Sequence, residues 1–240
     1  MSVNNTNTNT TRRDEIAAGL AEVERRIAGA CQSAGRARHE ITLVAVTKTR
    51  PASDVRILAG LGIRDVGENR DQEAAAKAGE CAGLPLTWHF VGQLQTNKVR
   101  SVVSYAGVIH SIDRPKLAEA VGREAVRTGR EVTCLVQVAL DEDPGRGGVV
   151  PAGLPALADL IAVTGGLRLG GVMAVAPLGG DPGPAFARLA ELSAELRKDH
   201  PDAKVISAGM SGDLAEAIRH GATHVRVGTA LLGRRTPFVR

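Results

Sequence analysis

The chain has 240 residues, and its 30 Lys and Arg residues against 26 Asp and Glu residues give a formal net charge of +4 at pH 7. The basic residues are scattered among acids and aromatic residues make up only 2% of the chain, which argues against the basic, aromatic-rich surfaces that bind nucleic acids. Hydrophobic residues make up 43% of the chain, which is typical of a globular protein and excludes bulk disorder, collagen and coiled coil.

The same composition predicts an α/β protein with reduced thiols. With so few aromatic residues, the core must come from Val, Leu, Ile and Ala, which fill parallel sheets. The three cysteines (Cys31, Cys81 and Cys134) form no CxxC pair, and the six histidines show no metal-binding spacing, so we expect neither disulfides nor a metal site. No apolar run is long enough to cross a bilayer. A cytoplasmic protein without membrane association is therefore expected.

The first elements in chain order are a tail and a helix. Residues 1–12 are dominated by Asn and Thr and cannot bury apolar surface, so we predict a disordered tail. After this tail, Ile16, Leu20 and Val23 begin an apolar pattern with helical spacing that continues to about Ala34. This pattern predicts one amphipathic helix.

Short runs rich in Val, Ile and Leu then alternate with Ala- and Leu-rich segments of helical periodicity. The runs begin at positions from 41 to 223, an average of 26 residues apart, which is about the length of one βα unit. The eight predicted strands are Ile41–Thr47, Ile63–Gly67, Trp88–Gly92, Gly107–Ile112, Val132–Ala139, Leu167–Val175, Ala203–Ala208 and Thr223–Gly228.

Eight strands that alternate with helices predict a (β/α)8 TIM barrel with an extra N-terminal helix. No shift in composition divides the chain, so residues 13–240 are expected to form this one domain. The alternative is an open, doubly wound sheet. The sequence has no G-x-G-x-x-G after the first predicted strand and no phosphate-binding P-loop motif, which counts against a nucleotide-binding fold of that kind.

Several residues mark the expected ends of helices. Pro51 falls in the first turn of the helix after the first strand, and Asp113 can cap the helix after the fourth strand. Gly129 and Gly165 fall where residues that follow a helix end belong. The last long helix should end before Pro201.

Lys48 follows the first predicted strand directly, in the sequence ITLVAVTKTRP. In a barrel of this class, the carboxyl ends of the strands carry the functional residues. We therefore expect Lys48 at the barrel mouth, above hydrophobic surroundings. Desolvation favours the neutral amine, which can form a Schiff base; a solvated lysine at a strand end is the alternative.

Two turns rich in small residues follow the seventh and eighth predicted strands, where barrels often bind phosphate. Ser211, Gly212 and Asp213 stand at the start of one helix, and Gly228 and Thr229 open another. Their amides and the Ser211 hydroxyl can bind an anion. Alternatively, Ser211 is only a helix cap and Gly228 only a tight-turn residue.

Arg226 and His89 lie within predicted strands. Strand alternation puts Arg226 on one face with His224 and Gly228; if that face is the barrel interior, the guanidinium needs an acceptor on the ligand or a neighbouring acid. For His89 we expect a core histidine held by hydrogen bonds rather than a ligand or a base. Asn69, after the second strand, can reach the mouth.

A lysine that faces a phosphate site implies a ligand with an aldehyde at one end and a phosphate at the other. Pyridoxal 5′-phosphate has this structure, and so do the substrates of phosphosugar aldolases. The residues alone leave both open.

Longer segments resemble one family, the pyridoxal phosphate homeostasis proteins, also called the YggS or PROSC family. The similarity covers nearly all of the chain after the tail. The segments that carry it are AVTKTRP around Lys48, the GEN of residues 67–69, WHFVGQLQTNK at residues 88–98 and GMSGDLAEAIRHGATHVRVGTALLG at residues 209–233.

The resemblance implies a barrel of the alanine racemase N-terminal type that binds pyridoxal phosphate as an internal aldimine on Lys48. It also implies that Arg226 faces the pyridine nitrogen, which keeps this nitrogen unprotonated and weakens the ring as an electron sink. The remaining implied cofactor-binding residues are Ser211, Gly212, Gly228 and Thr229 at the phosphate, Asn69 and Met210 at the ring, and His89 as a pocket neighbour.

The chain departs from the family pattern after the fifth predicted strand. The family has an asparagine and a lysine where this sequence has Ala139 and Arg146 in QVALDEDPGRGG. The role of that loop is therefore open, while the assignments of Lys48 and the phosphate turns are unaffected.

The resemblance also favours a carrier over an enzyme. Racemases of this fold use a tyrosine from a second domain as a base, but this chain ends just after the eighth strand and its only tyrosine, Tyr105, follows the third. We expect a monomeric, non-catalytic protein of pyridoxal phosphate homeostasis, with apoenzymes that need the cofactor as transient partners. The alternatives are a pyridoxal phosphate enzyme of alanine racemase type with Lys48 as base, and a Schiff-base aldolase without cofactor.

Overall fold

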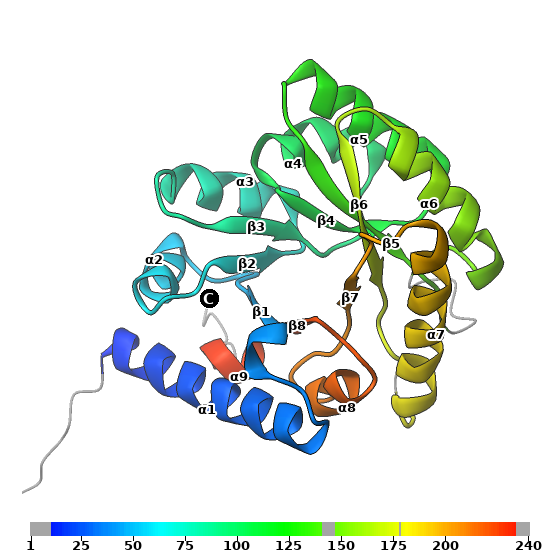
Figure 1. The fold of residues 1–240 in the computed structure, drawn as a ribbon. Helices are drawn as coiled ribbons and strands as arrows, with labels where there is room; N and C mark the ends of the chain where they lie inside the picture. Colours follow the sequence, from blue (N-terminus) through cyan, green and yellow to red (C-terminus); the bar gives the residue numbers. More distant parts are fainter. Residues whose placement is uncertain (1–10, 141–146, 178, 234–240) are drawn as a thin grey trace, which may run out of the picture.

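A computed structural model describes residues 11–140, 147–177 and 179–233. It contains a closed barrel of eight parallel strands in which each strand pairs with its neighbours in sequence and β8 pairs with β1 (Figure 1). The predicted barrel is thereby confirmed. The strands are β1 (Thr42–Val46), β2 (Asp65–Glu68), β3 (Thr87–Phe90), β4 (Val108–Ile112), β5 (Val132–Gln137), β6 (Leu167–Met173), β7 (Val205–Ser207) and β8 (His224–Val227).

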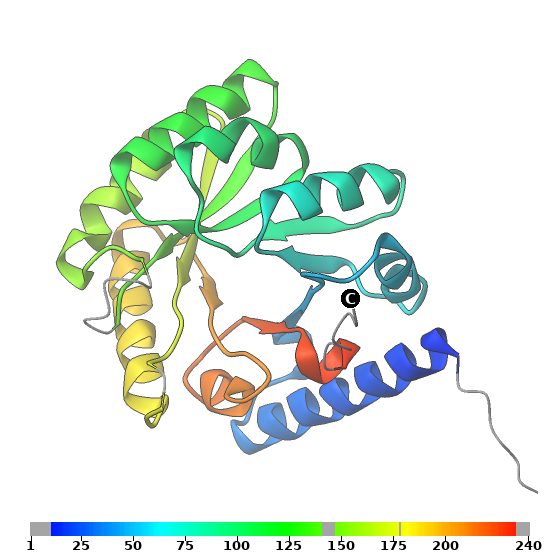
Figure 2. The same cartoon turned by 180° about the vertical axis from the view of Figure 1, so that it is seen from behind.

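Helices surround the barrel on its outer side (Figure 2). Their apolar faces pack on the strands, because each strand carries apolar side chains that only a covering layer can shield from water. The helices are α1 (Arg12–Ser33), α2 (Ala52–Gly60), α3 (Asp71–Glu80), α4 (Val99–Tyr105), α5 (Pro115–Arg127), α6 (Leu154–Val163), α7 (Gly183–Asp199), α8 (Leu214–Arg219) and α9 (Thr229–Leu232). Short 3₁₀ turns cover Arg38–Glu40, Thr96–Lys98 and Pro151–Gly153.

All eight predicted strands are present, and several are shorter than the apolar runs that predicted them. The predicted helix boundaries are less accurate. Asp113 does not cap α5; its carboxylate instead pairs with Arg114 at 2.5 Å. Arg114 is the N-cap in an extended conformation, and Pro115 is the first helical residue, because a residue before proline avoids the helical region. Pro51 is the N-cap of α2, one position before the expected first turn.

Two glycines were expected after helix ends. Gly129 has a φ of +65° just after α5 and confirms its prediction. After α6, Gly165 follows the C-cap Thr164 and so lies at the expected position, but the residue with the positive φ, +77°, is the next one, Gly166. The chain stays extended at the C-cap Thr164 before it turns.

The extra N-terminal helix, α1, lies along the outside of the barrel beside α8 and α9 (Figure 1). Its buried residues Ile16, Val23 and Ile27 join a core with β1, β2 and β8. The Arg12 guanidinium binds the buried Asp54 carboxylate of α2 at 2.6 Å and the Leu232 carbonyl of α9 at 3.2 Å. Helix α1 therefore fastens the first and last parts of the barrel to each other.

Two glycines of α1 provide a matched test of this packing. A Cβ atom on Gly19 would lie 2.3 Å from the Leu231 carbonyl oxygen of α9, whereas a Cβ atom on Gly29 would have no heavy atom within 4 Å. We expect Gly19→Ala to destabilise the protein by about 1–3 kcal/mol through overpacking. Gly29→Ala should stabilise it by about 0.5–1 kcal/mol through helix propensity. Urea unfolding measures both, and equal effects would contradict the close contact.

Cys31, Cys81 and Cys134 are buried and free. Within the described ranges, no group of three or more His, Cys, Asp or Glu residues is placed to hold a metal ion, and no helix is long and apolar enough to cross a membrane. Residues 1–10, most of the predicted tail, and Arg146 lie outside the described residues.

Candidate functional site

Except for His89 and Arg226, which lie within β3 and β8, the predicted site residues follow four strands that are adjacent in the barrel wall, in the order β2, β1, β8 and β7. Lys48 comes two residues after β1, and Asn69 comes directly after β2. The β1–β2 register pairs Val46 with Gly67, so both residues leave the barrel at the same level. Gly228 follows β8, whose Val227 pairs with Ala45. The carboxyl ends of these strands therefore bring Lys48 beside the Asn69 and Gly228 turns.

The Lys48 turn is held in place by a buried polar cluster of Thr47, Glu68 and Lys77. The Lys77 ammonium donates to the Thr47 carbonyl at 2.7 Å and lies 2.5 Å from a carboxylate oxygen of Glu68. The Thr47 hydroxyl donates to the same oxygen at 2.5 Å. Burial raises the pKa of the Glu68 carboxyl, and the Lys77 ammonium and the Thr47 hydroxyl oppose that rise. We call these three residues the Lys77 clamp.

Lys48 itself is exposed. The Lys77 clamp contacts the Thr47 backbone and side chain and not the Lys48 side chain, so the hydrophobic surroundings expected beneath Lys48 stay a prediction. The next residue, Thr49, has a φ of +63°, a left-handed backbone conformation that threonine rarely adopts. Its amide donates to the Glu73 carboxylate of α3 at 2.8 Å. Contacts on both sides of Lys48 therefore fix the backbone and leave its amine accessible.

The two small-residue turns after β7 and β8 contact each other. The Ala230 amide of α9 lies 3.5 Å from the Ser211 hydroxyl oxygen, and Arg26 of α1 donates to the Ser211 carbonyl at 2.6 Å. Asp213, rather than Ser211, is the residue that precedes the first turn of α8. The Ser211 hydroxyl is therefore directed to the start of α9, where Gly228 and Thr229 open that helix as predicted.

The glycines of these turns differ in their surroundings. A Cβ atom on Gly212 would meet no heavy atom within 4 Å, so this turn borders open space. A Cβ atom on Gly228 would lie 3.1 Å from the Val46 carbonyl oxygen of β1, which is tighter than ordinary contact. Gly228 thus lets the end of β8 approach the strand that carries Lys48.

Met210 lies between β7 and the Ser211 turn and is 39% exposed. Its amide donates to the Asp213 carboxylate at 2.6 Å. The preceding Gly209, with a φ of +88°, accepts at its carbonyl from the Arg226 amide at 2.9 Å. The thioether is therefore exposed while its backbone is fixed to β8.

Arg226 lies in the barrel interior, which settles the face that strand alternation left open. The guanidinium donates to the Ser207 hydroxyl oxygen at 2.6 Å and to the Ala174 carbonyl at 3.0 Å. Burial lowers the pKa of Arg226 to about 10, and the charge of Asp213 opposes this effect. The side chain therefore stays charged at neutral pH, although its two hydrogen-bond acceptors among the described residues are neutral.

His89 is a buried histidine with a partner at each ring nitrogen. Nε2 lies 2.9 Å from an Asp65 carboxylate oxygen, and Nδ1 lies 2.8 Å from Nε2 of His110. These contacts agree with the expectation of a hydrogen-bonded core histidine. They also connect His89 to a chain of polar groups that reaches Arg226.

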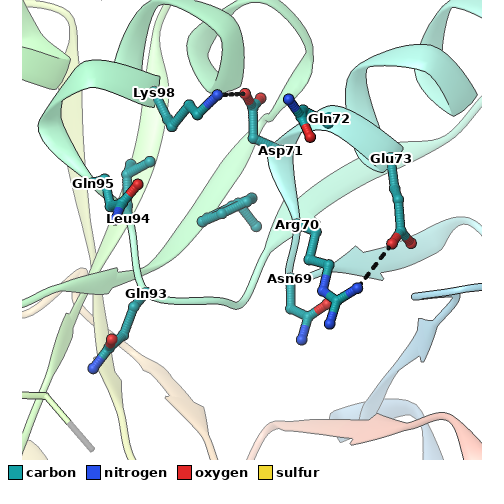
Figure 3. A pocket seen from close by; sticks show the side chains of 10 residues that line it. Asn69, Arg70, Asp71, Gln72, Glu73, Gln93, Leu94, Gln95 and Lys98 are labelled. Atoms are coloured by element: carbon teal, nitrogen blue, oxygen red, sulfur yellow. Dashed lines mark hydrogen bonds and ion pairs between the residues drawn. The ribbon is translucent and has the colours of Figure 1, made fainter. Parts of the chain in front are cut away.

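A polar cavity of about 440 Å³ adjoins Asn69, between the loops that follow β2 and β3 (Figure 3). Figure 3 shows Asn69 and Arg70 on one side of it and Gln93 on the other. Lys98 reaches the Asp71 carboxylate at 4.0 Å. The Asn69 side-chain oxygen and one Asp71 oxygen are buried without a hydrogen-bond partner among the described residues. This side of the mouth can therefore still accept hydrogen bonds from a ligand.

Sequence reasoning missed the Lys77 clamp and the polar chain that contains His110 and Ser207. A signal for Lys77 is present: it falls three residues after Ala74 and four before Cys81, and all three are buried. A lysine at a core position of a helical pattern needs a buried partner. For His110 and Ser207, the only signal is that each is a polar residue within an apolar strand. This signal does not show which residue is its hydrogen-bond partner.

Comparisons with known proteins agree with this geometry. The alanine racemase N-terminal domain family matches residues 10–236. A pyridoxal phosphate homeostasis protein of Mycobacterium leprae is 43% identical over 92% of this chain and 93% of its own length. One from Corynebacterium glutamicum is 42% identical over 89% of this chain and 99% of its own length.

Solved structures extend the comparison to the fold. PipY of Synechococcus elongatus, solved with PLP bound, has a TM-score of 0.80 and 37% identity over 91% of this chain and 100% of its own. An alanine racemase of Clostridium difficile has a TM-score of 0.74 at 13% identity and shows likeness of fold alone. The chain belongs to the family of pyridoxal phosphate homeostasis proteins, with a barrel of the alanine racemase N-terminal type.

Proposed function

We propose that this protein binds pyridoxal 5′-phosphate at the barrel mouth and acts in pyridoxal phosphate homeostasis. The names of its relatives and the PLP-bound PipY structure support this function. The observation that carries it is the convergence of an accessible lysine amine and two small-residue turns at the ends of β1, β7 and β8.

The residues present fit this cofactor. Bound pyridoxal phosphate supplies an aldehyde that reacts with amines and a ring that withdraws electrons. Lys48 would hold the aldehyde end covalently. The open surroundings of Gly212 and the Ser211 hydroxyl beside the first turn of α9 support phosphate binding by Ser211, Gly212, Gly228 and Thr229. The remaining assignments place Arg226 at the ring nitrogen, Asn69 and Met210 along the ring, and His89 in the surrounding polar network.

The same proposal includes a non-catalytic role. Tyr105, the only tyrosine of the chain, packs edge-on against Trp88 at a centroid distance of 6.4 Å. Burial raises the pKa of its hydroxyl, with further contributions from Asp71 and Glu68. A tyrosine that keeps its proton is unsuited to serve as a second base. Apoenzymes as acceptors, a monomeric state and a cytoplasmic location stay predictions.

Replacement of Lys48 tests cofactor binding. We expect the wild-type protein to keep pyridoxal phosphate through dialysis and to show its yellow absorption band. After borohydride reduction, mass spectrometry should find the cofactor on the peptide that contains Lys48. Lys48→Ala should lose both signals because it lacks the amine. Lys98→Ala, at another partly exposed lysine near the mouth, should keep them. Retention of the covalent adduct by Lys48→Ala would contradict the assignment.

Turnover tests the non-catalytic role separately. We expect no sustained racemisation, transamination or decarboxylation when the cofactor-loaded protein is incubated with a panel of D- and L-amino acids. Chiral chromatography of the products measures this. A turnover that Lys48→Ala abolishes would contradict the carrier role and leave cofactor binding unaffected.

A further inference from the structure

A chain of hydrogen bonds crosses the barrel interior from Asp65 on β2 to Arg226 on β8. Asp65 contacts His89 at 2.9 Å, and His89 contacts His110 on β4 at 2.8 Å. His110 contacts the Ser207 hydroxyl on β7 at 2.9 Å, and Arg226 donates to that hydroxyl at 2.6 Å. His89, His110, Ser207 and Arg226 are all buried, while Asp65 is partly exposed. We call these five residues the interior chain.

The chemistry of its two ends fixes the direction of every hydrogen bond. A guanidinium can only donate and a carboxylate can only accept. His89 therefore carries its hydrogen on Nε2, toward Asp65. Its Nδ1 then accepts from Nε2 of His110, and Nδ1 of His110 accepts from the Ser207 hydroxyl. The Ser207 oxygen is left to accept from Arg226, so each contact has one donor and one acceptor.

The opposite direction leaves the Ser207 hydrogen without an acceptor in the interior chain. If His110 donated from Nδ1, the Ser207 oxygen would accept from both His110 and Arg226. Neither of these two residues could then accept the Ser207 hydrogen. Burial lowers the pKa of His110 well below its ordinary value, and His89, His224 and Arg226 act in the same direction. A neutral His110 has one donor and one acceptor nitrogen, as the first arrangement requires.

We propose that Asp65, His89, His110 and Ser207 are positioning residues for Arg226: Asp65 sets the direction of the interior chain, which keeps the Ser207 oxygen an obligate acceptor and fixes the guanidinium below the mouth. The inference rests on the proposed function for the identity of the ligand. A guanidinium held at Ser207 and Ala174 has a fixed orientation, from which it would face the ring nitrogen of the cofactor. Coupled polar networks transmit such effects beyond direct contacts.

The hydrogen positions can be measured on the cofactor-free wild-type protein. Long-range ¹H–¹⁵N NMR of the histidine side chains distinguishes the two neutral tautomers from the cation. We expect both His89 and His110 to carry their hydrogen on Nε2, with Nδ1 as an acceptor. A hydrogen on Nδ1 of either ring would overturn the proposal. This measurement needs no variant, so it stands even if a substitution in the barrel prevents folding.

Variants test whether the chain acts on the cofactor. Ser207→Ala should weaken pyridoxal phosphate binding about tenfold, the order found for groups coupled in one network, and shift the pH dependence of the visible band of the bound cofactor. Ser207→Thr, which restores a hydroxyl, should recover both. Asp65→Asn should shift the His110 resonances and change the band in the same direction. Asp159→Asn is the matched control, because Asp159 contacts His200 at 2.8 Å on the surface.

The outcomes separate this inference from the proposed function. If Asp65→Asn leaves the His110 resonances unchanged, or if Ser207→Ala binds with wild-type affinity and an unshifted band, the interior chain does not position Arg226. If the wild-type protein does not bind pyridoxal phosphate at all, the proposed function is wrong. The NMR tautomers would then still confirm or overturn the direction of the chain.

Discussion

Replacement of Lys77 by methionine is expected to destabilise the protein by about 3–5 kcal/mol, the usual cost when one partner of a buried ion pair is removed. Glu68 is fully buried and the Lys77 side chain is 8% exposed. Without the ammonium, the Thr47 hydroxyl is the one hydrogen-bond donor that the described residues leave to the Glu68 carboxylate. Since typical domains are stable by only about 5–15 kcal/mol, urea unfolding should show a large shift of the midpoint.

Lys98→Met is the matched control for this loss. Its side chain is 38% exposed and lies 4.0 Å from Asp71, so its removal should cost about 1 kcal/mol or less. The double variant Glu68→Gln with Lys77→Met removes both charges and should be more stable than Lys77→Met alone. Similar losses in Lys77→Met and Lys98→Met would show that the Lys77 clamp does not hold the turn. The clamp also contacts the residue before Lys48, so Lys77→Met should weaken cofactor binding as well.

The second large effect is a loss of stability in mild acid. Burial lowers the pKa of His224 to about 4, with smaller contributions from His89 and Arg226. The unfolded chain takes up a proton on this ring near its ordinary pKa of about 6.5, while the folded protein resists until about pH 4. Stability therefore falls as pH drops through this window. The contribution of His224 is about 3 kcal/mol across the window, and His110 adds to it because burial lowers its pKa as well.

Urea unfolding at a series of pH values between 7.5 and 4 measures this effect. His224→Gln should flatten the dependence, even if the lost contact with Thr223 lowers its stability at pH 7.5. His39→Gln, at an exposed histidine, should keep the wild-type slope. A free energy of unfolding that stays constant from pH 6.5 to 4.5 would contradict this prediction. It would mean that His224 and His110 take up protons without destabilising the folded protein.

The sequence was sufficient to predict the barrel because its evidence is repetitive. Each strand, such as β5 with all six residues buried, appears as an apolar run, and eight runs at similar spacing define one topology. Lys48 and the Gly228 turn could also be placed, because the carboxyl ends of the strands share one face of a barrel. These predictions need only the order of the strands and turns along the chain, which can be read from the sequence.

Predictions that depend on partners distant in sequence were less successful. The ammonium of Lys77 on α3 donates to the carbonyl of Thr47, directly before Lys48, and this contact was not predicted. Nothing near Lys48 in sequence indicates that contact. Asp113 was expected as a cap, but a proline two positions later sets the helix start. The missed contact arises from tertiary packing. The error at Asp113 arises because the proline fixes where the helix starts, which outweighs the capping propensity of aspartate.

The pairing of β1 with β8 has a consequence for how the protein is made. Lys48 leaves the first strand, and the turns expected to bind phosphate leave the last two. Strand β8 begins roughly 180 residues after β1. During synthesis the ribosome therefore releases β1 long before its β8 partner. If these turns bind the phosphate, a nascent chain has the complete cofactor site only when translation of the barrel is almost complete. Binding of pyridoxal phosphate would then report that this barrel has closed.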